Sequence, residues 1–174
     1  VAPSSGDIGD EITVSGTGFG PEVDVDVKLD GDIVNSTTTD ADGALSATFA
    51  VPRIANGTYN ITVGSANVEF TVNPTYVGFE ITEPSTALIV NPVAGSTGTT
   101  TFVVSALGNM PINITGITST DLTNEGTYTI SNVSFSPSSV EFEWDGTQTI
   151  TVTVVLDGEP VEGTYSGTIT LTDG

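Results

Sequence analysis

The sequence predicts an all-β protein built from two antiparallel β-sandwiches in tandem. Apolar residues alternate with polar ones in short runs, and no long segment shows the period of an amphipathic helix. Gly, Pro, Asn and Asp separate these runs at intervals of about ten residues, which is typical of small sandwich domains. A Pro-containing break then divides the runs into two groups.

The first group covers residues 1–73. Its predicted strands are Glu11–Ser15, Val23–Leu29, Ile33–Thr38, Leu45–Val51, Thr58–Val63 and Val68–Val72. The connections use residues that tolerate positive φ, namely Gly16–Gly18, Asp30–Asp32, Asp40–Gly43 and Asn56–Gly57. Along the second strand, the period of two sends Val23, Val25, Val27 and Leu29 to the core and Asp24, Asp26, Lys28 and Asp30 to solvent.

The break lies at Asn73-Pro74-Thr75, where Pro74 has no N–H for a strand ladder and restricts Asn73 to extended geometry. We therefore expect one domain at residues 1–73 and a second at residues 74–174. The predicted strands of the second domain are Val77–Ile81, Ala87–Val90, Thr99–Ala106, Ile112–Thr118, Tyr128–Phe135, Val140–Trp144, Thr147–Leu156 and Thr164–Thr172. Its predicted turns are Gly95–Gly98, Asp145-Gly146 and Asp157-Gly158.

The charge composition argues against several classes of function. The 174 residues include Lys+Arg 2 against Asp+Glu 22, which gives a formal charge of −20 at pH 7, and there is no His or Cys. So few cations argue against binding to nucleic acid or anionic lipid. Without His and Cys there are no conventional zinc, iron–sulfur or haem ligands, and no His bases or Cys nucleophiles. Ser/Lys chemistry could use only Lys28.

Paired carboxylates remain formally open to catalysis, but Glu141 and Glu143 flank Phe142 on outward positions, so we expect no enzymatic activity. No run approaches ~18 apolar residues, so we expect no membrane insertion. With 37% hydrophobic residues and a mean hydropathy of +0.15, the chain can still bury a core. Val1–Ser4 reads as a mature N-terminus from which a signal peptide has been removed.

Both halves carry motifs that resemble known surface modules. PSSGDIGDEITVSGTGFGP, VDVKLDG, TTTDADGALSATFAVP and GTYNITV cover nearly all of residues 1–73 and resemble the immunoglobulin-like (TIG/IPT-like and related) repeats of bacterial and archaeal cell-surface proteins. GNMPINITGI, VSFSPSSVEFEWDGTQTITVTVVL and GTYSGTITLTDG, within residues 99–174, are similar to the immunoglobulin-like domains of archaeal S-layer and secreted proteins. EFEWDGTQ departs from the Pro-Gly turn that is more common there. The resemblance implies a fold and a surface location, but no reaction.

Asn-x-Ser/Thr triplets are the strongest functional signal, because they are acceptors for N-linked glycans in secreted proteins. The candidate acceptors are Asn35, Asn56, Asn60, Asn113 and Asn132. A chain this rich in Ser and Thr also produces such triplets by chance, and these asparagines then belong to ordinary turns and strand ends. Asn73 and Asn91 are excluded because Pro follows each directly.

Acidic turns offer a weaker signal. Asp30, Asp32, Asp40 and Asp42 could supply oxygen ligands to Ca²⁺, but the EF-hand spacing is absent, so plain turns are the main alternative. Trp144 and the tyrosines Tyr59, Tyr76, Tyr128 and Tyr165 could form a sugar-stacking platform. Tyr59 and Tyr165, each in a GTY context, are more typical of core or corner residues.

Together these features predict a secreted structural glycoprotein that acts as a subunit of an extracellular filament (a pilus or thread) or a surface layer, and the resemblance implies an archaeal source. We expect copies to join head-to-tail through β-strand edges, with donor-strand complementation as one mode. Thr147–Leu156 and Gly163–Leu171 are the expected edge or acceptor strands, and Val1–Ser5 is short for a donor. Other cell-surface components are possible partners. The alternative function is a spacer or carbohydrate-binding module of a larger adhesin or secreted enzyme.

The charge balance also predicts how assembly depends on conditions. Near neutral pH, the uncompensated negative charges would need counter-ions before subunits could pack closely. Acid would neutralise the carboxylates and leave few cations to repel one another. We therefore expect assembly to depend on pH or on divalent ions.

Overall fold

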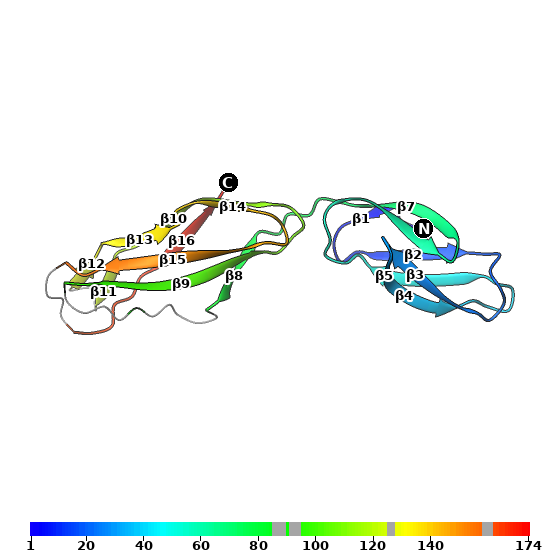
Figure 1. Ribbon diagram of the computed structural model, residues 1–174, viewed down its shortest axis with the longest axis horizontal. Helices are drawn as coiled ribbons and strands as arrows, with labels where there is room; N and C mark the ends of the chain where they lie inside the picture. The colour runs from blue at the N-terminus through cyan, green and yellow to red at the C-terminus, as the bar shows by residue number, and fades with distance from the viewer. Residues whose placement is uncertain (85–89, 91–94, 125–127, 158–161) are drawn as a thin grey trace. The chain divides into compact units, whose positions relative to one another are not determined.

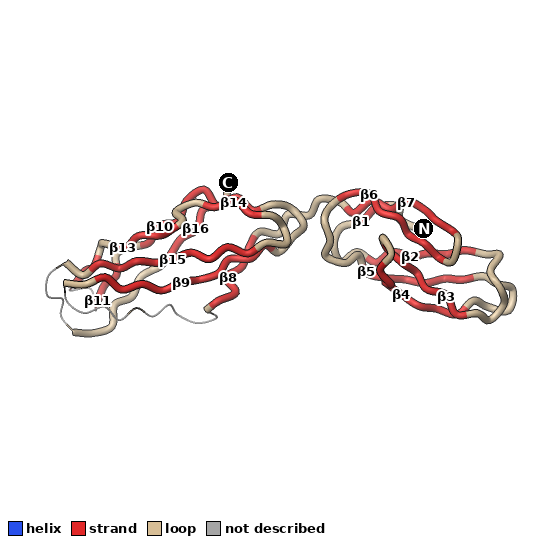
Figure 2. The backbone as a smooth tube through the Cα atoms, in the orientation of Figure 1, coloured by secondary structure: helices blue, strands red, loops and turns tan. Residues whose placement is uncertain are grey.

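The protein is all-β. The computed structural model describes residues 1–84, 90, 95–124, 128–157 and 162–174, and all its regular elements are strands (Figures 1 and 2). The chain divides into two compact units. The first contains Val1–Tyr76 and Gly108–Met110, and the second contains Val77–Leu107 and Pro111–Gly174.

In the first unit, two sheets face each other across one core. The strands are β1 (Ser5–Gly6), β2 (Glu11–Gly16), β3 (Asp24–Leu29), β4 (Asp32–Thr38), β5 (Leu45–Ala50), β6 (Gly57–Val63) and β7 (Ala66–Val72). Their order is β1-β7-β6-β3-β4 in the five-stranded sheet, and β2 pairs with β5 in the other. All neighbours are antiparallel except β1 and β7, which run parallel.

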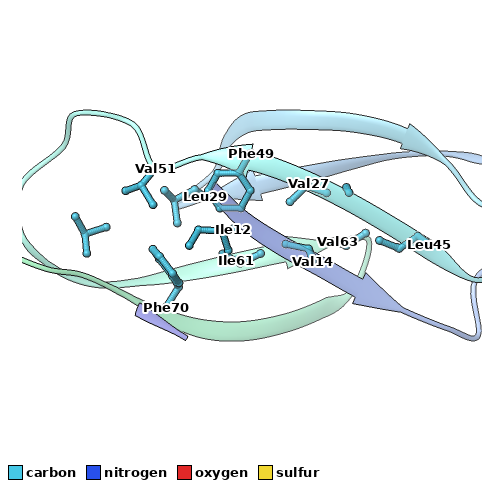
Figure 3. Packing of buried hydrophobic residues seen from close by; sticks show 12 residues of the cluster. Ile12, Val14, Val27, Leu29, Leu45, Phe49, Val51, Ile61, Val63 and Phe70 are labelled. Carbon is cyan, nitrogen blue, oxygen red and sulfur yellow. The ribbon is translucent and has the colours of Figure 1, made fainter. Parts of the chain in front are cut away.

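Apolar side chains at every second position fill this core. β2 and β5 contribute Ile12, Val14, Leu45, Ala47 and Phe49, and the facing sheet contributes Val27, Leu29, Ile61, Val63, Phe70 and Val72 (Figure 3). Phe49 and Phe70 meet edge to face across the two sheets, with ring centroids 6.5 Å apart. The alternation predicted for β3 is wrong at its start, because Val23 precedes the strand and is 41% exposed.

Turn chemistry fixes the connections in the first unit. Asp30 and Gly31 both have positive φ, as a two-residue hairpin between β3 and β4 requires. At Gly43, φ is +70° and a Cβ would lie 2.1 Å from the carbonyl oxygen of Phe19, so only glycine fits. The Tyr59 hydroxyl donates a hydrogen bond to the carbonyl of Ala55 at 2.8 Å, which gives Tyr59 the corner role expected from its sequence context.

The second unit also places strands around one core. Its strands are β8 (Phe79–Glu83), β9 (Thr97–Ala106), β10 (Ile112–Ser119), β11 (Leu122–Asn124), β12 (Tyr128–Ile130), β13 (Val133–Ser136), β14 (Val140–Phe142), β15 (Thr147–Val155) and β16 (Ile169–Asp173). The sheet orders are β13-β15-β9-β8, β14-β10-β16 and β11-β12. The buried residues are Phe102, Val104, Ala106, Ile112, Ile114, Ile117, Ile150, Val152, Val154 and Leu156.

Several details differ from the predicted elements. The edge position expected for Thr147–Leu156 is wrong, because β15 is hydrogen-bonded on one side to β13 and on the other to β9. Its strong β-propensity reflects burial on one face, with Ile150, Val152 and Val154 in the core. The predicted strand Tyr128–Phe135 is interrupted between β12 and β13. The predicted strand Ala87–Val90 lies almost entirely outside the described residues.

A buried asparagine, Asn109, is hydrogen-bonded to the segment that follows β7 in the first unit. Asn109 is 0% exposed, and its side-chain oxygen accepts a hydrogen bond from the backbone N–H of Thr75 at 2.7 Å. Its side-chain amide donates to the carbonyl of Asn73 at 3.1 Å, and its backbone N–H donates to the carbonyl of Thr75 at 3.0 Å. Arg53 Nε donates to the neighbouring carbonyl of Gly108 at 3.0 Å. Gly108–Met110 is thereby held against the segment that follows β7.

Candidate functional site: acceptor asparagines, acidic turns and strand edges

The structure separates the candidate acceptor asparagines into two groups. Asn56, in the bend before β6, and Asn60, within β6, are exposed. Asn113 in β10 and Asn132 just before β13 are exposed as well. Asn35 differs, because its side chain is half-buried in β4 and its amide donates a hydrogen bond to the carbonyl of Thr48 in β5.

The two strand positions project outward for a simple reason. Asn60 lies next to the buried Ile61, and Asn113 lies between the buried Ile112 and Ile114, so strand alternation turns both away from the core. Each lies opposite an acidic residue, Asn60 opposite Glu69 of β7 and Asn113 opposite Glu141 of β14.

The acidic residues considered for Ca²⁺ lie in two separate turns. Asp30 and Asp32 belong to the β3–β4 hairpin, whereas Asp40 and Asp42 belong to the connection from β4 to β5. Asp40 Oδ1 accepts backbone N–H groups of Asp42 at 3.0 Å and Ala44 at 2.8 Å, so this carboxylate stabilises its own turn. Within the described ranges, no group of three or more His, Cys, Asp or Glu side chains is positioned to hold a metal ion.

The carboxylates on β3 are engaged with hydroxyl groups of β4. Asp24 Oδ1 accepts a hydrogen bond from Thr38 Oγ1, and Asp26 Oδ1 accepts one from Ser36 Oγ, each at 2.7 Å. These cross-strand pairs lie on the outer face of the five-stranded sheet, as the alternation along β3 predicted for both aspartates. This face therefore carries exposed negative charge together with Asn60.

The outer face of the four-stranded sheet has the opposite character. Its outward positions on β9, β15 and β13 carry only Thr, Ser and Val, and we call this surface the hydroxyl face. Two rows of hydroxyl side chains cross it, formed by Thr99, Thr153 and Ser134, and by Thr101, Thr151 and Ser136. Sequence reasoning missed this face, although the repeated Thr-x-Thr alternation in both long strands was a visible signal.

Among the described residues, β16 is an edge strand with little charge. β16 pairs with β10, and no other described strand pairs with it. The edge strands β8 and β14 carry Glu80, Glu83 and Glu141, charges that discourage further strand pairing. β16 has a single charge, Asp173, at its end, and β13, the edge strand beside β15, has none.

The apolar residues of β16 lie at the margin of the core. Ile169 and Leu171 pack against the buried cluster, but both are only half-buried. The N–H of Ile117, opposite Leu171, donates to Ser138 and not to β16, while Thr120 donates to Thr168. Since antiparallel pairs alternate, the N–H and C=O groups of Ile169 and Leu171 point away from β10, toward the side on which no other described strand pairs with β16.

The remaining candidates occupy separate places. Glu141 and Glu143 are exposed on either side of the half-buried Phe142, and Trp144 is also half-buried. Tyr76 and Tyr128 are 48% and 47% exposed and belong to different units. Among the described residues, no helix has the length and apolar character that a membrane span requires. No protein-family model matches the chain, and no curated protein matches it in sequence.

Proposed function

We propose that the protein is a secreted structural subunit of an extracellular filament or surface layer, with two immunoglobulin-like sandwiches in tandem that join copies through β-strand edges. The observation that carries this proposal is the side of β16 away from β10, where no other described strand pairs and backbone hydrogen-bonding groups lie beside half-buried apolar side chains. An unpaired strand edge promotes aggregation of a monomer, and in a polymer it can pair with a strand of the next subunit.

A strand added along β16 would hydrogen-bond the outward backbone groups and cover the half-buried apolar side chains at the same time. Its backbone would pair with the outward N–H and C=O groups of Ile169 and Leu171, which is the β-augmentation mode. Its side chains would cover the exposed part of the Ile169 and Leu171 side chains at the margin of the second core. Completion of a sheet by an extended segment of another copy is donor-strand complementation.

Residues 1–6 are already engaged within the first unit, so in this fold they do not serve as the donor. Ala2 bridges to Thr13 of β2, and Ser5 and Gly6 pair with Thr71 and Val72 of β7. Val1 also packs against the first core. A donor must therefore come from another segment of the neighbouring copy, or these residues must first leave their own sheet.

Charge supports contact between copies at uncharged surfaces. At −20, two copies repel each other wherever acidic faces approach. The hydroxyl face and the edge of β16 carry almost no charge, so close packing there costs less electrostatic repulsion.

Proline at Leu171 tests the joint. Leu171→Pro removes one outward N–H without removing a hydrogen bond between β10 and β16, and edge strands tolerate proline at such positions. Leu171→Ala is the matched control, since it loses the same side-chain packing and keeps the N–H. We expect negatively stained filaments or sheets with the alanine variant and few or none with the proline variant.

A second measurement does not depend on a variant. Hydrogen exchange at the Leu171 amide should slow on assembly, because that N–H would then be hydrogen-bonded to the added strand. An unchanged Leu171 exchange rate in assembled material, or equal assembly of the two variants, would contradict the proposed joint. A glycan array that shows saccharide preference in a strictly monomeric protein would favour the carbohydrate-binding alternative.

A further inference from the structure

We infer that the exposed asparagines Asn56, Asn60, Asn113 and Asn132 carry N-linked oligosaccharides and that Asn35, although it stands in the same kind of triplet, stays unmodified. The inference rests on the proposed function in one respect, since it needs a chain that is exported to a compartment with glycosylating enzymes. It adds a distinction among the triplets that the sequence does not contain.

The register of β4 places Asn35 on the core side. Val27 pairs with Asn35, and the next residue of β3, Lys28, pairs with Ile33. Val34 therefore has no partner in β3, and β4 forms a β-bulge at this point. Because directly opposed residues project to the same side of a sheet, Asn35 shares the side of Val27, which is fully buried. The Asn35 amide donates to the Thr48 carbonyl, so its nitrogen faces the backbone of β5. A sugar on that nitrogen would have to separate β4 from β5.

The other four asparagines are exposed. Asn60 points outward from the middle of β6 and Asn113 from the beginning of β10, and Asn56 and Asn132 lie outside regular strands. The amide of Asn132 donates to Asp157 Oδ2 at 3.2 Å, but both residues are exposed and water can replace this bond. In strands, Asn and the hydroxyl residue two positions later share a face, so the triplet is presented as a unit.

The chemistry requires a sugar donor and no oxidant or reductant. The donor class is an oligosaccharide joined through its anomeric carbon to a lipid-linked phosphate. The Asn side-chain nitrogen forms a bond to the anomeric carbon, and the bond from that carbon to the phosphate oxygen breaks. The phosphate leaves with the electron pair, and the amide nitrogen loses one proton to a base of the transferring enzyme. One N–H remains on the modified amide.

Glycopeptide mass spectrometry on folded protein from its own source tests the inference directly. We expect a glycan mass on the peptides that contain the exposed asparagines and an unmodified Asn35 peptide. In the same host, Asn60→Gln should lower the intact mass by one glycan, and the matched Asn35→Gln should leave the glycan count unchanged. A glycan on Asn35 in folded protein, or bare asparagines at most of the exposed sites, would overturn the inference.

Short peptides, which have no fold, distinguish the effect of the burial of Asn35 from a preference of the transferring enzyme for other triplet sequences. Synthetic peptides with the five triplets, given a lipid-linked oligosaccharide and the host's oligosaccharyl transferase, should all be modified, including the one with Asn35. Refusal of the Asn35 peptide would show that its sequence, and not its place in the fold, keeps it bare. Filaments with bare asparagines would contradict this inference alone, whereas glycosylated protein that stays monomeric would contradict only the proposed function.

Discussion

Replacement of Asn109 by alanine should destabilise the first unit by about 2 kcal/mol. The substitution removes the side-chain hydrogen bonds to Thr75 N–H and to the Asn73 carbonyl, at a position with no exposed surface. Each net hydrogen bond contributes about 0.5–1.5 kcal/mol, and the half-buried partners regain only part of their solvation. Asn109→Asp should cost at least as much, because it keeps the acceptor but loses the donor and buries a carboxylate.

Hydrogen exchange is the suitable assay, because two units need not unfold in one transition. The slowest amides of β3 and β6 report the opening of the first unit, and a loss of 2 kcal/mol corresponds to about thirty-fold faster exchange. Asn67→Ala, at an exposed position of β7, is the control and should change stability by less than about 0.5 kcal/mol. If Asn109→Ala accelerates these amides no more than Asn67→Ala does, the reasoning is wrong.

Two further predictions concern the corner of the first unit and the conditions of assembly. Tyr59→Phe removes the hydrogen bond to the Ala55 carbonyl and should cost about 1 kcal/mol in the free energy of unfolding of the first unit, measured by exchange of the same β3 and β6 amides; unchanged exchange would refute a structural role for the hydroxyl. Light scattering at about pH 3 to 8, with and without a chelator, should show that assembly depends on acid or on divalent ions, because acid or bound cations neutralise the −20 charge. An assembly indifferent to both would contradict this prediction.

Local sequence information predicted most of the first unit. β2 to β7 each follow from a short alternating run, and the Asp30-Gly31 turn specifies the β3–β4 hairpin. β1 was missed because Ser5 and Gly6 have no strand pattern of their own, and they become a strand only by pairing in parallel with β7, far along the chain. All-β architecture is therefore a local property here, whereas part of the pairing is not.

Sheet order could not be predicted from the sequence for the same physical reason. β15 and β16 are both β-prone, but propensity reports a fit to a pleated, half-buried surface and does not say how many neighbours a strand has. The expectation for Thr147–Leu156 was therefore wrong, while the stretch from Gly163 to Leu171 does lead into an edge strand.

The candidate site shows the same division between local and non-local information. The acceptor triplets are visible in the sequence, but the inward orientation of Asn35 depends on the bulge between Val27 and Lys28. No pattern in the sequence predicts the burial of Asn109, because it arises from contacts with Asn73 and Thr75, more than thirty positions away. Hydrogen bonds between segments distant in sequence decide both cases.

An electron cryo-microscopy map of the assembled protein from its own source is the most direct test of the central claim. We expect an additional strand from a neighbouring copy along β16, hydrogen-bonded to Ile169 and Leu171 and covering the margin of the second core. An ordered filament or layer in which the edge of β16 faces solvent would contradict it.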